Sequence, residues 1–582
     1  MGNPARPVKM RKVLFDCLAQ QGELMFGSFS EIPSLANCDV CVVGGGPAGI
    51  ALALACEERG LSVLLLESGK HKVDVFYAGL STGHDVDLET HAAPDLAICR
   101  ALGGASKWWG GRCTPLDEID FAKRAFVEAN WPISYAELAT CYNKAAEFFG
   151  VAPADFISPV QPWGRLEGVR FEDLERWTPE RDVSKRHRER LATSKDIVIV
   201  AETTVTEIHA SEDARHVSRL TVRSREKSIA ISPNYIVLAC GGLETTRLLL
   251  WTQSKVPKLF GGPEGPLGRY YSGHISGKIA NLILGDPAHF PAHDYFLDSG
   301  VFVRRRFTFP PEVQRREELL NIALYADNPP FHSADHRDGV LSLAWLALAT
   351  PILGRFLASE GVRMSHLGSV PYRWFQHLRN VLSQPVATWA NIVSILNQRY
   401  FSVPRKPGFL LFSARGRYAL HYHAEQSPNP QSRVMLSSKF DAFGLPYLSV
   451  RLRFSESDAQ SVVRAHSILD TALRQSGLGY LEFGETGAES RVKHVLRQAK
   501  DGFHQIGTTR MGFDSQQSVV NTDCRTHDLE NLYIASSSVF SSPGQANPTF
   551  PTVALGFRLS AHLASQIAKE RVVGGSKHRL AP

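Results

Sequence analysis

The sequence lacks the marks of several protein classes. Its 582 residues include nine cysteines, an odd number scattered from Cys17 to Cys524, and no disulfide framework is visible. The formal net charge is only +6, from 64 basic and 58 acidic residues that are well mixed, so no dense basic face for nucleic acid is predicted. Residues 1–35 contain no continuous apolar stretch, which argues against a signal peptide. Reduced thiols favour a cytoplasmic location.

Long hydrophobic runs are also scarce. The most apolar run, residues 340–358, is broken by Pro351 and charged by Arg355, and it is too short to predict a membrane span. We expect it to form a buried helix or a lid, with contact to a membrane surface as the alternative.

Cys38 and Cys41 have CxxC spacing, but an offset of three puts them on opposite faces of a strand. We therefore expect buried small residues there, not a redox or metal pair.

The chain has ordinary globular composition, with 43% hydrophobic and 21% charged residues, and its length favours two or more domains. The N-terminal third contains the clearest pattern. Apolar residues predict strands over 39–43 and 61–66, and a helix over 47–59 lies between them. A glycine-rich turn, Gly44-Gly45-Gly46-Pro47-Ala48-Gly49, joins the first strand to that helix. This strand, turn, helix and strand order is the context of dinucleotide binding.

Each glycine of the G-x-G-x-x-G pattern in this turn has a physical role. Gly44 permits the tight turn, Gly46 lets the backbone approach a pyrophosphate, and Gly49 lets the helix pack closely on the strand. The helix N-terminus offers unpaired N–H groups and a partial positive charge to phosphates. Glu67 ends the second strand and can accept hydrogen bonds from a ribose diol, so NADP is disfavoured. A second loop, residues 102–111, holds four glycines and two tryptophans, which suits close approach to a flat ligand.

The same kind of unit recurs later, so the nucleotide-binding domain is discontinuous. Strands are predicted over 235–240 and 532–535, followed by helices over 244–251 and 549–568. We predict an α/β fold with a Rossmann-like FAD-binding domain and an α+β substrate-binding domain built on a mixed or antiparallel sheet. Strands over 433–436 and 447–454 and a helix over 457–476 are assigned to the second domain. The predicted FAD-binding segments are 37–115, 200–270 and 495–575, and the substrate-binding segments are 116–199 and 271–494, with a helix-rich insertion at about 323–415.

Several motifs in a fixed order make the chain similar to the glucose–methanol–choline (GMC) family of flavin oxidoreductases. The resemblance covers most of the chain, with 323–415 as the exception, and is nearest to sugar-oxidising members such as pyranose oxidases. Besides the first glycine loop, the segments that carry it are 100–106, 131–135, 239–244, 425–434 and 504–565.

The resemblance implies a role for each matching residue. His504 would be the catalytic base, and Asn547 would hydrogen bond to the substrate oxygen. Noncovalent FAD would be held at its pyrophosphate, ribose, adenine and flavin by Gly44, Gly46, Gly49, Glu67, Gly103, Gly104, Ser106, Val205, Pro548 and Thr549. Many members have a second histidine where this chain has Asn547. Pyranose oxidases attach flavin through a histidine in the second glycine loop, where this chain has Lys107 and Trp108, so we predict no covalent link.

The function implied is oxidation of an alcohol, such as a sugar, glycoside or polyol, by hydride transfer to flavin N5. His504, neutral near pH 7, would accept the hydroxyl proton, and Asn547 would stabilise the oxygen. The alternatives are a lipid or sterol alcohol enzyme, a lyase that keeps FAD without redox turnover, and a noncatalytic flavoprotein. No metal or nucleic acid is expected. The electron acceptor (oxygen, a quinone or a redox protein), the oxidised carbon and the oligomeric state are left open.

Overall fold

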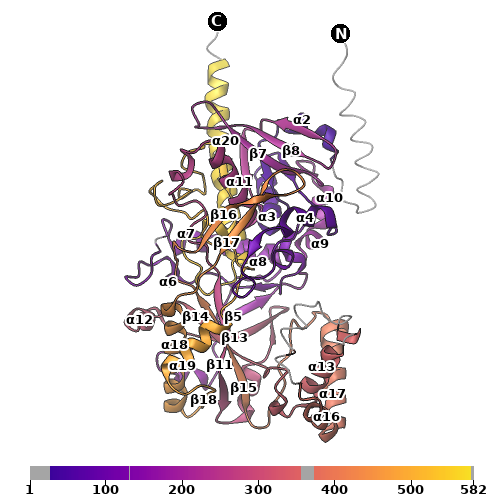
Figure 1. Ribbon diagram of the computed structural model, residues 1–582, viewed down its shortest axis with the longest axis vertical. Helices are drawn as coiled ribbons and strands as arrows, with labels where there is room; N and C mark the ends of the chain where they lie inside the picture. The colour runs from indigo at the N-terminus through magenta and orange to yellow at the C-terminus, as the bar shows by residue number, and fades with distance from the viewer. Residues whose placement is uncertain (1–26, 130, 351, 355–366, 368–371, 579–582) are drawn as a thin grey trace.

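The structure is a computed structural model that describes residues 27–129, 131–350, 352–354, 367 and 372–578. Cys17 and most of the N-terminal segment 1–35 lie outside this part, as do Pro351 and Arg355. The eight cysteines within it are unpaired. Cys38 and Cys41 are both buried, as expected, and burial raises the pKa of Cys38 to about 11. Figure 1 shows two halves stacked along the long axis, with α20 (Thr549–His578) running through one of them.

A parallel five-stranded sheet organises the first half, which confirms the predicted Rossmann-like architecture. The strand order is β19-β10-β1-β2-β6, and every pair is parallel. α3 (Pro47–Glu57) leads from the first strand toward the second and packs against α20. The five strands are β1 (Val40–Val43), β2 (Val63–Leu66), β6 (Ile197–Val200), β10 (Tyr235–Leu238) and β19 (Leu532–Ile534). All residues of β1 and β2 are buried, as expected for strands covered on both faces.

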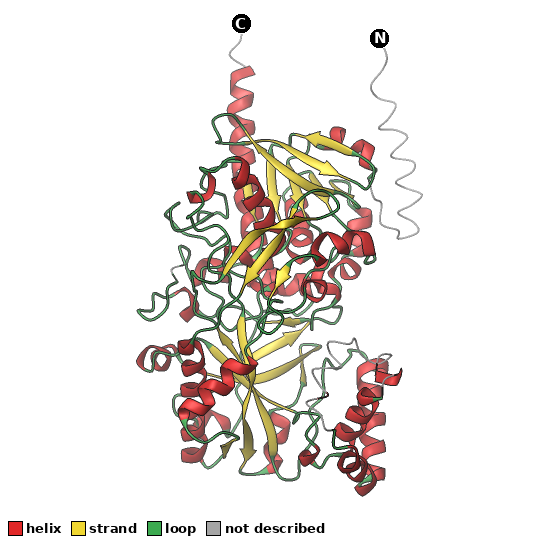
Figure 2. Cartoon of the chain, viewed as in Figure 1, coloured by secondary structure: helices red, strands yellow, loops and turns green. Residues whose placement is uncertain are grey.

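An antiparallel sheet of eight strands organises the second half (Figure 2). Its order is β18-β11-β15-β14-β13-β5-β4, with β12 paired to β13. α18 (Glu456–Ser476) and α19 (Ala488–Gln498) pack against this sheet. α18 begins with a capping box between Ser455 and Asp458. The strands are β4 (Arg112–Cys113), β5 (Arg170–Trp177), β11 (His274–Leu284), β12 (Phe296–Asp298), β13 (Val301–Thr308), β14 (Ile322–Asp327), β15 (Arg417–Glu425) and β18 (Gly479–Phe483).

Two smaller sheets lie apart from these. One joins β7 (Thr204–Ala210), β8 (Val217–Arg223) and β9 (Ser228–Ile231). The other joins β3 (Asp85–Val86), β16 (Arg433–Phe440) and β17 (Pro446–Arg451). The sequence assigned β16 and β17 to the substrate-binding sheet, and the structure corrects this. They pack against α11 (Gly242–Lys255). The sequence could not show this, because an alternating pattern fixes which faces a strand presents and not which strands it pairs with.

The helix-rich insertion is present but begins later than predicted. Residues 322–327 form β14, in the middle of the antiparallel sheet. The insertion holds α13 (Gly339–Ala349), α16 (Trp374–Ser383) and α17 (Pro385–Leu396), which lie together on one side of the second half (Figure 1). α13 takes up residues 340–349 of the most apolar run and is largely buried, as expected, whereas Ile352 and Leu353 later in the run are exposed. Within the described ranges, no helix is long and apolar enough to cross a membrane.

Shorter helices complete the first half and its boundary with the second. α7 and α8 pack against α20, which links residues 135–149 to the FAD-binding half. The shorter helices are α2 (Ile32–Leu35), α4 (Val75–Thr82), α5 (Pro94–Ala97), α6 (Glu118–Phe121), α7 (Tyr135–Ala139), α8 (Tyr142–Phe149), α9 (Val183–Arg186), α10 (Arg188–Thr193) and α12 (Pro311–Arg316).

Candidate active site

The first glycine turn is shaped by close packing of backbone on backbone. Gly44 has φ +108°, and a Cβ there would lie 2.5 Å from the carbonyl oxygen of Ala239. A Cβ on Gly49 would lie 1.9 Å from the oxygen of Gly44. Gly46 differs, because a Cβ there would meet nothing within 4 Å and its backbone lines a cavity. Gly44 and Gly49 therefore set the turn, and Gly46 leaves room above the N-terminus of α3.

Glu67 lies where β2 ends and lines the same cavity, although it is only 5% exposed. Its carboxylate accepts hydrogen bonds from the N–H groups of Gly45 and Gly69, each at 2.7 Å. Burial raises the pKa of Glu67, and these two hydrogen bonds act in the opposite direction. A carboxylate can accept about four hydrogen bonds, so Glu67 keeps acceptor capacity for hydroxyl groups in the cavity.

The second glycine loop lies directly against the first. The N–H of Gly103 donates to the oxygen of Gly45 at 2.7 Å, and a Cβ on Gly104 would lie 2.9 Å from the Cα of Gly46. Gly103 itself faces Asp182 and does not line the cavity, and neither does Gly49. Ser106 lines the cavity, and its hydroxyl donates to the oxygen of Gly103 at 2.5 Å.

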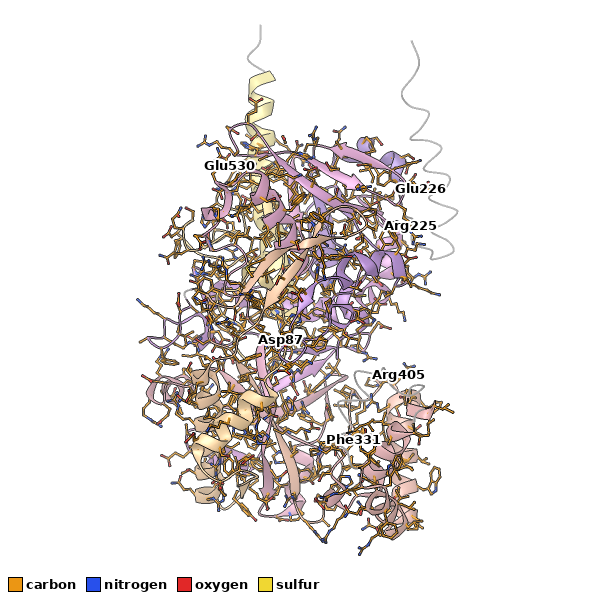
Figure 3. The ribbon with its side chains drawn as sticks, viewed as in Figure 1. Asp87, Arg225, Glu226, Phe331, Arg405 and Glu530 are labelled. Carbon is orange, nitrogen blue, oxygen red and sulfur yellow. The ribbon has the colours of Figure 1, made fainter. Side chains whose placement is uncertain are left out.

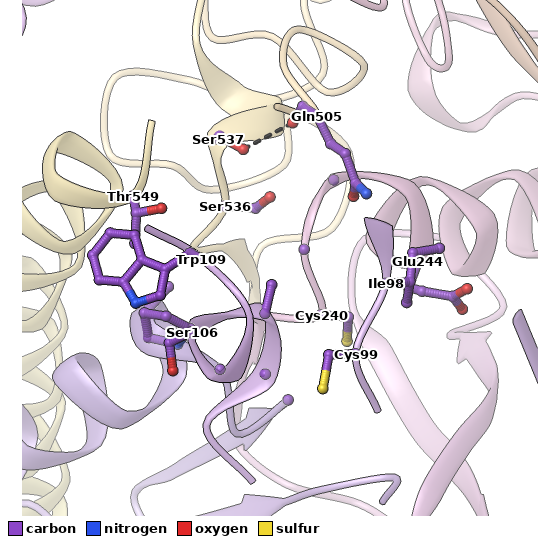
Figure 4. Close-up of a pocket in the computed structure, with 18 of the residues that line it drawn as sticks. Ile98, Cys99, Ser106, Trp109, Cys240, Glu244, Gln505, Ser536, Ser537 and Thr549 are labelled. Carbon is purple, nitrogen blue, oxygen red and sulfur yellow. Dashed lines mark hydrogen bonds between the residues drawn. The ribbon is translucent and has the colours of Figure 1, made fainter. Parts of the chain in front are cut away.

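The cavity between these loops has a volume of about 730 Å³. Figure 4 shows how residues from distant segments meet there, with Ser106 and Trp109 near Thr549, and Glu244 on the opposite side. The hydroxyl of Ser537 donates to the oxygen of Gln505 at 2.8 Å. The predicted residues that line the cavity are Gly44, Gly46, Glu67, Gly104, Ser106, Val205, His504, Asn547, Pro548 and Thr549.

This cavity suits a dinucleotide. The cavity above Gly46 is bordered by the N-termini of α3 and α20. The partial positive charges of these helix ends favour phosphate and electron-rich groups. A buried acidic acceptor, Glu67, lines the same cavity, and Val205 and Leu248 add apolar surface. Lys107 is turned to Asp182, with its ammonium 2.8 Å from the carboxylate.

His504 and Asn547 meet within this cavity. Asn547 Nδ2 lies 3.0 Å from His504 Nε2, and Asn547 Oδ1 accepts from Arg112 Nε at 2.6 Å. Because a guanidinium can only donate, the amide oxygen of Asn547 must face Arg112 and its NH₂ must face His504. Nε2 of His504 is therefore the acceptor, and the ring proton lies on Nδ1.

Asp501 completes this arrangement, and sequence analysis missed it. His504 Nδ1 donates to Asp501 Oδ2 at 2.9 Å, and the N–H of His274 donates to the same oxygen at 2.6 Å. Burial alone would raise the pKa of Asp501, but His504 and the hydrogen bonds hold it at about 2. The residue is therefore an anion at neutral pH. Its position three residues before His504 was the only signal in the sequence.

Two further histidines lie behind His504. His274 Nδ1 is 3.0 Å from His504 Nδ1, and His423 stacks on His274 with ring centroids 4.3 Å apart. Burial lowers the pKa of His274 to about 3 and that of His423 well below its usual value. Nitrogens of the three rings approach within 4.8 Å of one another, a spacing open to metal ligation, but His504 Nδ1 already donates to Asp501. His274 and His423 are neutral neighbours that sequence analysis did not single out.

The second half contributes a polar wall to the cavity. Glu175 is fully buried and accepts from Arg112 Nη1 at 3.1 Å and from Arg304 Nε at 2.7 Å. Burial opposes its ionisation, yet the two arginines lower the pKa of Glu175. Arg304 lies 3.6 Å over the ring of Tyr325. Arg112, Tyr295, Arg304, Tyr325 and Asp327 all line the cavity. Sequence analysis missed them, and the run of three arginines at 304–306 was the only hint.

Two family descriptions match the chain. "GMC oxidoreductase" matches residues 428–556, which include His504 and Asn547, and "FAD binding domain" matches residues 39–86, which include the first glycine turn and Glu67. Neither match includes the arginines of the polar wall.

Individual proteins are also similar. The chain is 21% identical over 605 residues to 2-methyl-1,2-propanediol dehydrogenase from Mycolicibacterium austroafricanum, covering 92% of this chain and 96% of that protein. It is 30% identical over 144 residues to 6'''-hydroxyparomomycin C oxidase from Streptomyces lividus, a match to 25% of this chain and only 24% of that protein. The structure of pyridoxine 4-oxidase from Mesorbium loti has the same fold, with a TM-score of 0.51 at 17% identity, covering 90% of this chain and 99% of that chain.

Proposed function

The chain belongs to the GMC family of FAD-dependent oxidoreductases, and on this premise we propose that it oxidises a sugar, glycoside or polyol with His504 as the base. The observation that carries the proposal is the pairing of His504 Nε2 with Asn547 Nδ2, 3.0 Å apart, in the wall of the cavity. One atom of this pair is a proton acceptor and the other is a donor. A substrate hydroxyl that lies beside both atoms, in place of their mutual hydrogen bond, would meet both needs of alcohol oxidation.

The residues that would hold FAD form one continuous surface. We assign the pyrophosphate to the turn of Gly44 and Gly46, set by the packing of Gly49, and the adenosine ribose to Glu67. Val205 would contact the adenine, and Gly104 and Ser106, with Gly103 as support, would border the flavin side. Pro548 and Thr549 would lie near the flavin ring. FAD, when bound, supplies the acceptor for the hydride that leaves the carbinol carbon.

The chain's own residues move the proton. His504 Nε2 accepts the hydroxyl proton as the carbon–hydrogen bond breaks, and the substrate becomes a carbonyl compound. Asn547 Nδ2 donates to the oxygen as it gains negative charge. Asp501 holds the other ring proton on Nδ1 at 2.9 Å, and its negative charge stabilises the imidazolium that forms. Arg112 fixes the amide of Asn547 in the donating orientation.

The polar wall supports a substrate with several hydroxyl groups. Arg112, Arg304, Tyr295 and Asp327 all offer donors or acceptors to the cavity, and a sterol would leave these groups without partners at a cost. Relatives named for a propanediol and for a hydroxylated paromomycin are in keeping with this substrate class.

The deciding experiment is anaerobic stopped-flow absorbance of the purified holoenzyme. The panel contains sugars, glycosides, polyols, and aliphatic, aryl and sterol alcohols. Bleaching of the flavin band by a polyhydroxy substrate supports the proposal, and admission of oxygen then separates an oxidase from a dehydrogenase. Bleaching by sterols alone favours the lipid alcohol alternative. A protein that holds FAD and bleaches with no alcohol is a lyase or a noncatalytic flavoprotein.

We also propose that FAD is held without a covalent bond. Residues 102–111 contain no histidine, and the amine of Lys107 is paired with Asp182. Acid precipitation should leave the yellow colour in the supernatant, and colour in the pellet would contradict this.

A cytoplasmic location is also part of the proposed function, supported by eight unpaired cysteines among the described residues.

A further inference from the structure

The helix α16 is amphipathic in the opposite sense to a surface helix in water, and α17 beside it also exposes large apolar side chains. Phe375, Leu378 and Leu382 repeat along one face of α16, and all three are exposed. Their spacing of three and four residues puts them on one side of the helix. The opposite, buried side holds His377 and Asn380. Polar groups therefore face the protein, and apolar groups face outward.

α17 also exposes apolar side chains, although its inner side is mixed, with half-buried Ile392 and Ile395 beside the buried Thr388. Its exposed face is formed by Val386, Trp389, Val393 and Leu396. Phe375 is 79% exposed and Trp389 is 65% exposed. We call the exposed apolar residues of both helices the outer face, defined by Phe375, Leu378, Leu382, Val386, Trp389, Val393 and Leu396.

Polar contacts on the inner side hold the outer face in this orientation. His377 Nδ1 lies 3.1 Å from Ser342 Oγ, and its ring stacks on Trp345 at 4.0 Å. Asn380 Nδ2 donates to the same hydroxyl at 3.0 Å and to the oxygen of Ala334 at 2.8 Å. Rotating α16 to bury its apolar side would break these bonds and leave buried groups unsatisfied, which is costly. The outward orientation is thus built into the fold.

The segment that carries the outer face contains only basic charged residues, although the exposed carboxylate of Asp335 lies beside Arg373. The sequence contains no aspartate or glutamate between Glu360 and Glu425. Arg373 pairs with Asp335 at 3.6 Å and Lys406 with Asp294 at 2.7 Å. The ion pairs between described residues include none for Arg379, Arg399 or Arg405. Arg405, labelled in Figure 3, lies on the side of the molecule that carries these helices.

We propose that the outer face docks on a membrane surface that contains anionic lipids. Exposed aromatic and aliphatic side chains can enter the boundary between headgroups and acyl chains, while the arginines reach the phosphates. Tryptophan is favoured at this depth. Since no described helix can cross a membrane, the helices would lie on the surface. Because α13 is largely buried, the contact predicted from residues 340–358 shifts to α16 and α17, and only Ile352 and Leu353 remain as large exposed apolar residues among the described part of that run.

A second copy of the chain fits this surface less well. A two-fold contact would bring the outer faces together and place Arg379 and Arg399 of one copy near the same cations of the other. Like charges at an interface are unfavourable, and residues 361–424 supply no acid to offset them. A bilayer with anionic headgroups can take up the exposed apolar side chains and also pair with the arginines.

Co-sedimentation of the full-length holoenzyme with vesicles tests the proposal. The probes are vesicles of phosphatidylcholine alone and of phosphatidylcholine with an equal part of phosphatidylglycerol. We expect binding to the anionic vesicles and at least about tenfold weaker binding to the neutral ones. The variant Phe375→Gln/Trp389→Gln should bind the anionic vesicles at least about tenfold more weakly. Both positions are exposed, so the flavin spectrum and thermal midpoint should not change.

The matched control is Phe513→Gln, which removes a phenylalanine that is 74% exposed elsewhere on the surface and should bind like the wild type. Wild-type protein that stays in the supernatant overturns the proposal, as does equal binding by Phe375→Gln/Trp389→Gln. Equal binding to neutral vesicles overturns the role of the arginines. Light scattering that shows a dimer, converted to a monomer by the double variant without vesicle binding, assigns the outer face to a second copy.

Discussion

Arg112 Nε donates to Asn547 Oδ1 across 2.6 Å, and this contact decides which atom of the amide faces His504. Arg112 is itself held by Glu175, 3.1 Å from its Nη1. From Glu175 through Arg112 and Asn547 to His504, each group orients the next. Without Arg112 the amide could turn, and its oxygen would then face the developing negative charge on the substrate.

Arg112→Met should therefore reduce kcat by about tenfold to 100-fold, the value of a hydrogen bond to a charged group. Steady-state kinetics and anaerobic flavin reduction measure this loss. Arg305→Met is the control, because Arg305 bonds to Ser158 and does not line the cavity. Equal kcat in Arg112→Met and wild type would show that Asn547 needs no external orientation.

His504→Ala should slow anaerobic flavin reduction by at least about 10²-fold, the low end for a positioned base. The spectrum of bound FAD should persist, since the substitution removes no glycine turn. His527→Ala is the matched control, because His527 bonds to Ser518 outside the cavity. A rate of flavin reduction in His504→Ala close to that of the wild type would rule out the assigned base.

Asp501 should make the stability of the fold depend on pH. Its pKa of about 2 lies below the ordinary value of 3.8, so its ionised form stabilises the fold above about pH 4, and this contribution is lost as the pH falls toward 2. Across that window the wild type should lose about 2 kcal/mol relative to Asp501→Asn. Thermal midpoints of both proteins at several acidic pH values measure the difference. Parallel pH profiles would contradict it.

Gly46 and Gly49 should respond differently to the same added methyl group. Gly46→Ala meets no atom of the protein within 4 Å, so the apoprotein should keep its stability while FAD affinity falls by at least about tenfold. Gly49→Ala places Cβ 1.9 Å from the oxygen of Gly44 and should destabilise the fold by about 3 kcal/mol. Flavin titration and thermal unfolding separate the two effects, and identical behaviour would refute the distinction.

Local patterns predicted much of the FAD-binding half. The strands at Val40–Val43 and Val63–Leu66, the helix between them and the glycine turn are specified by neighbours in sequence. His504 and Asn547 were predicted through the family resemblance, and the structure brings them together. Arg112 and Glu175 were missed, because their contact depends on how β4 pairs with β5, which alternation along one strand does not encode. Asp501 was missed although it lies only three residues before His504, because that spacing alone does not mark a catalytic partner.

The outer face shows a different limit of sequence reasoning. The spacing of apolar residues in α16 and α17 predicts helices, but the usual rule would turn those residues inward. The structure buries His377 and Asn380 instead, because Ser342 and the backbone of Ala334 offer them hydrogen bonds. Which face of a helix is buried thus depends on its partners as well as on its periodicity.

The cavity is built from both halves of the molecule, and its walls come from separate segments of the chain. Residues 39–86 and 428–556, which match the family descriptions, hold the first glycine turn, His504 and Asn547. Arg112, Glu175 and Arg304 come from the antiparallel sheet and lie outside both matches. Substitutions in these strands can therefore alter one wall of the cavity without touching the first glycine turn, His504 or Asn547. Variants of this wall should change which alcohol is accepted while FAD binding is retained.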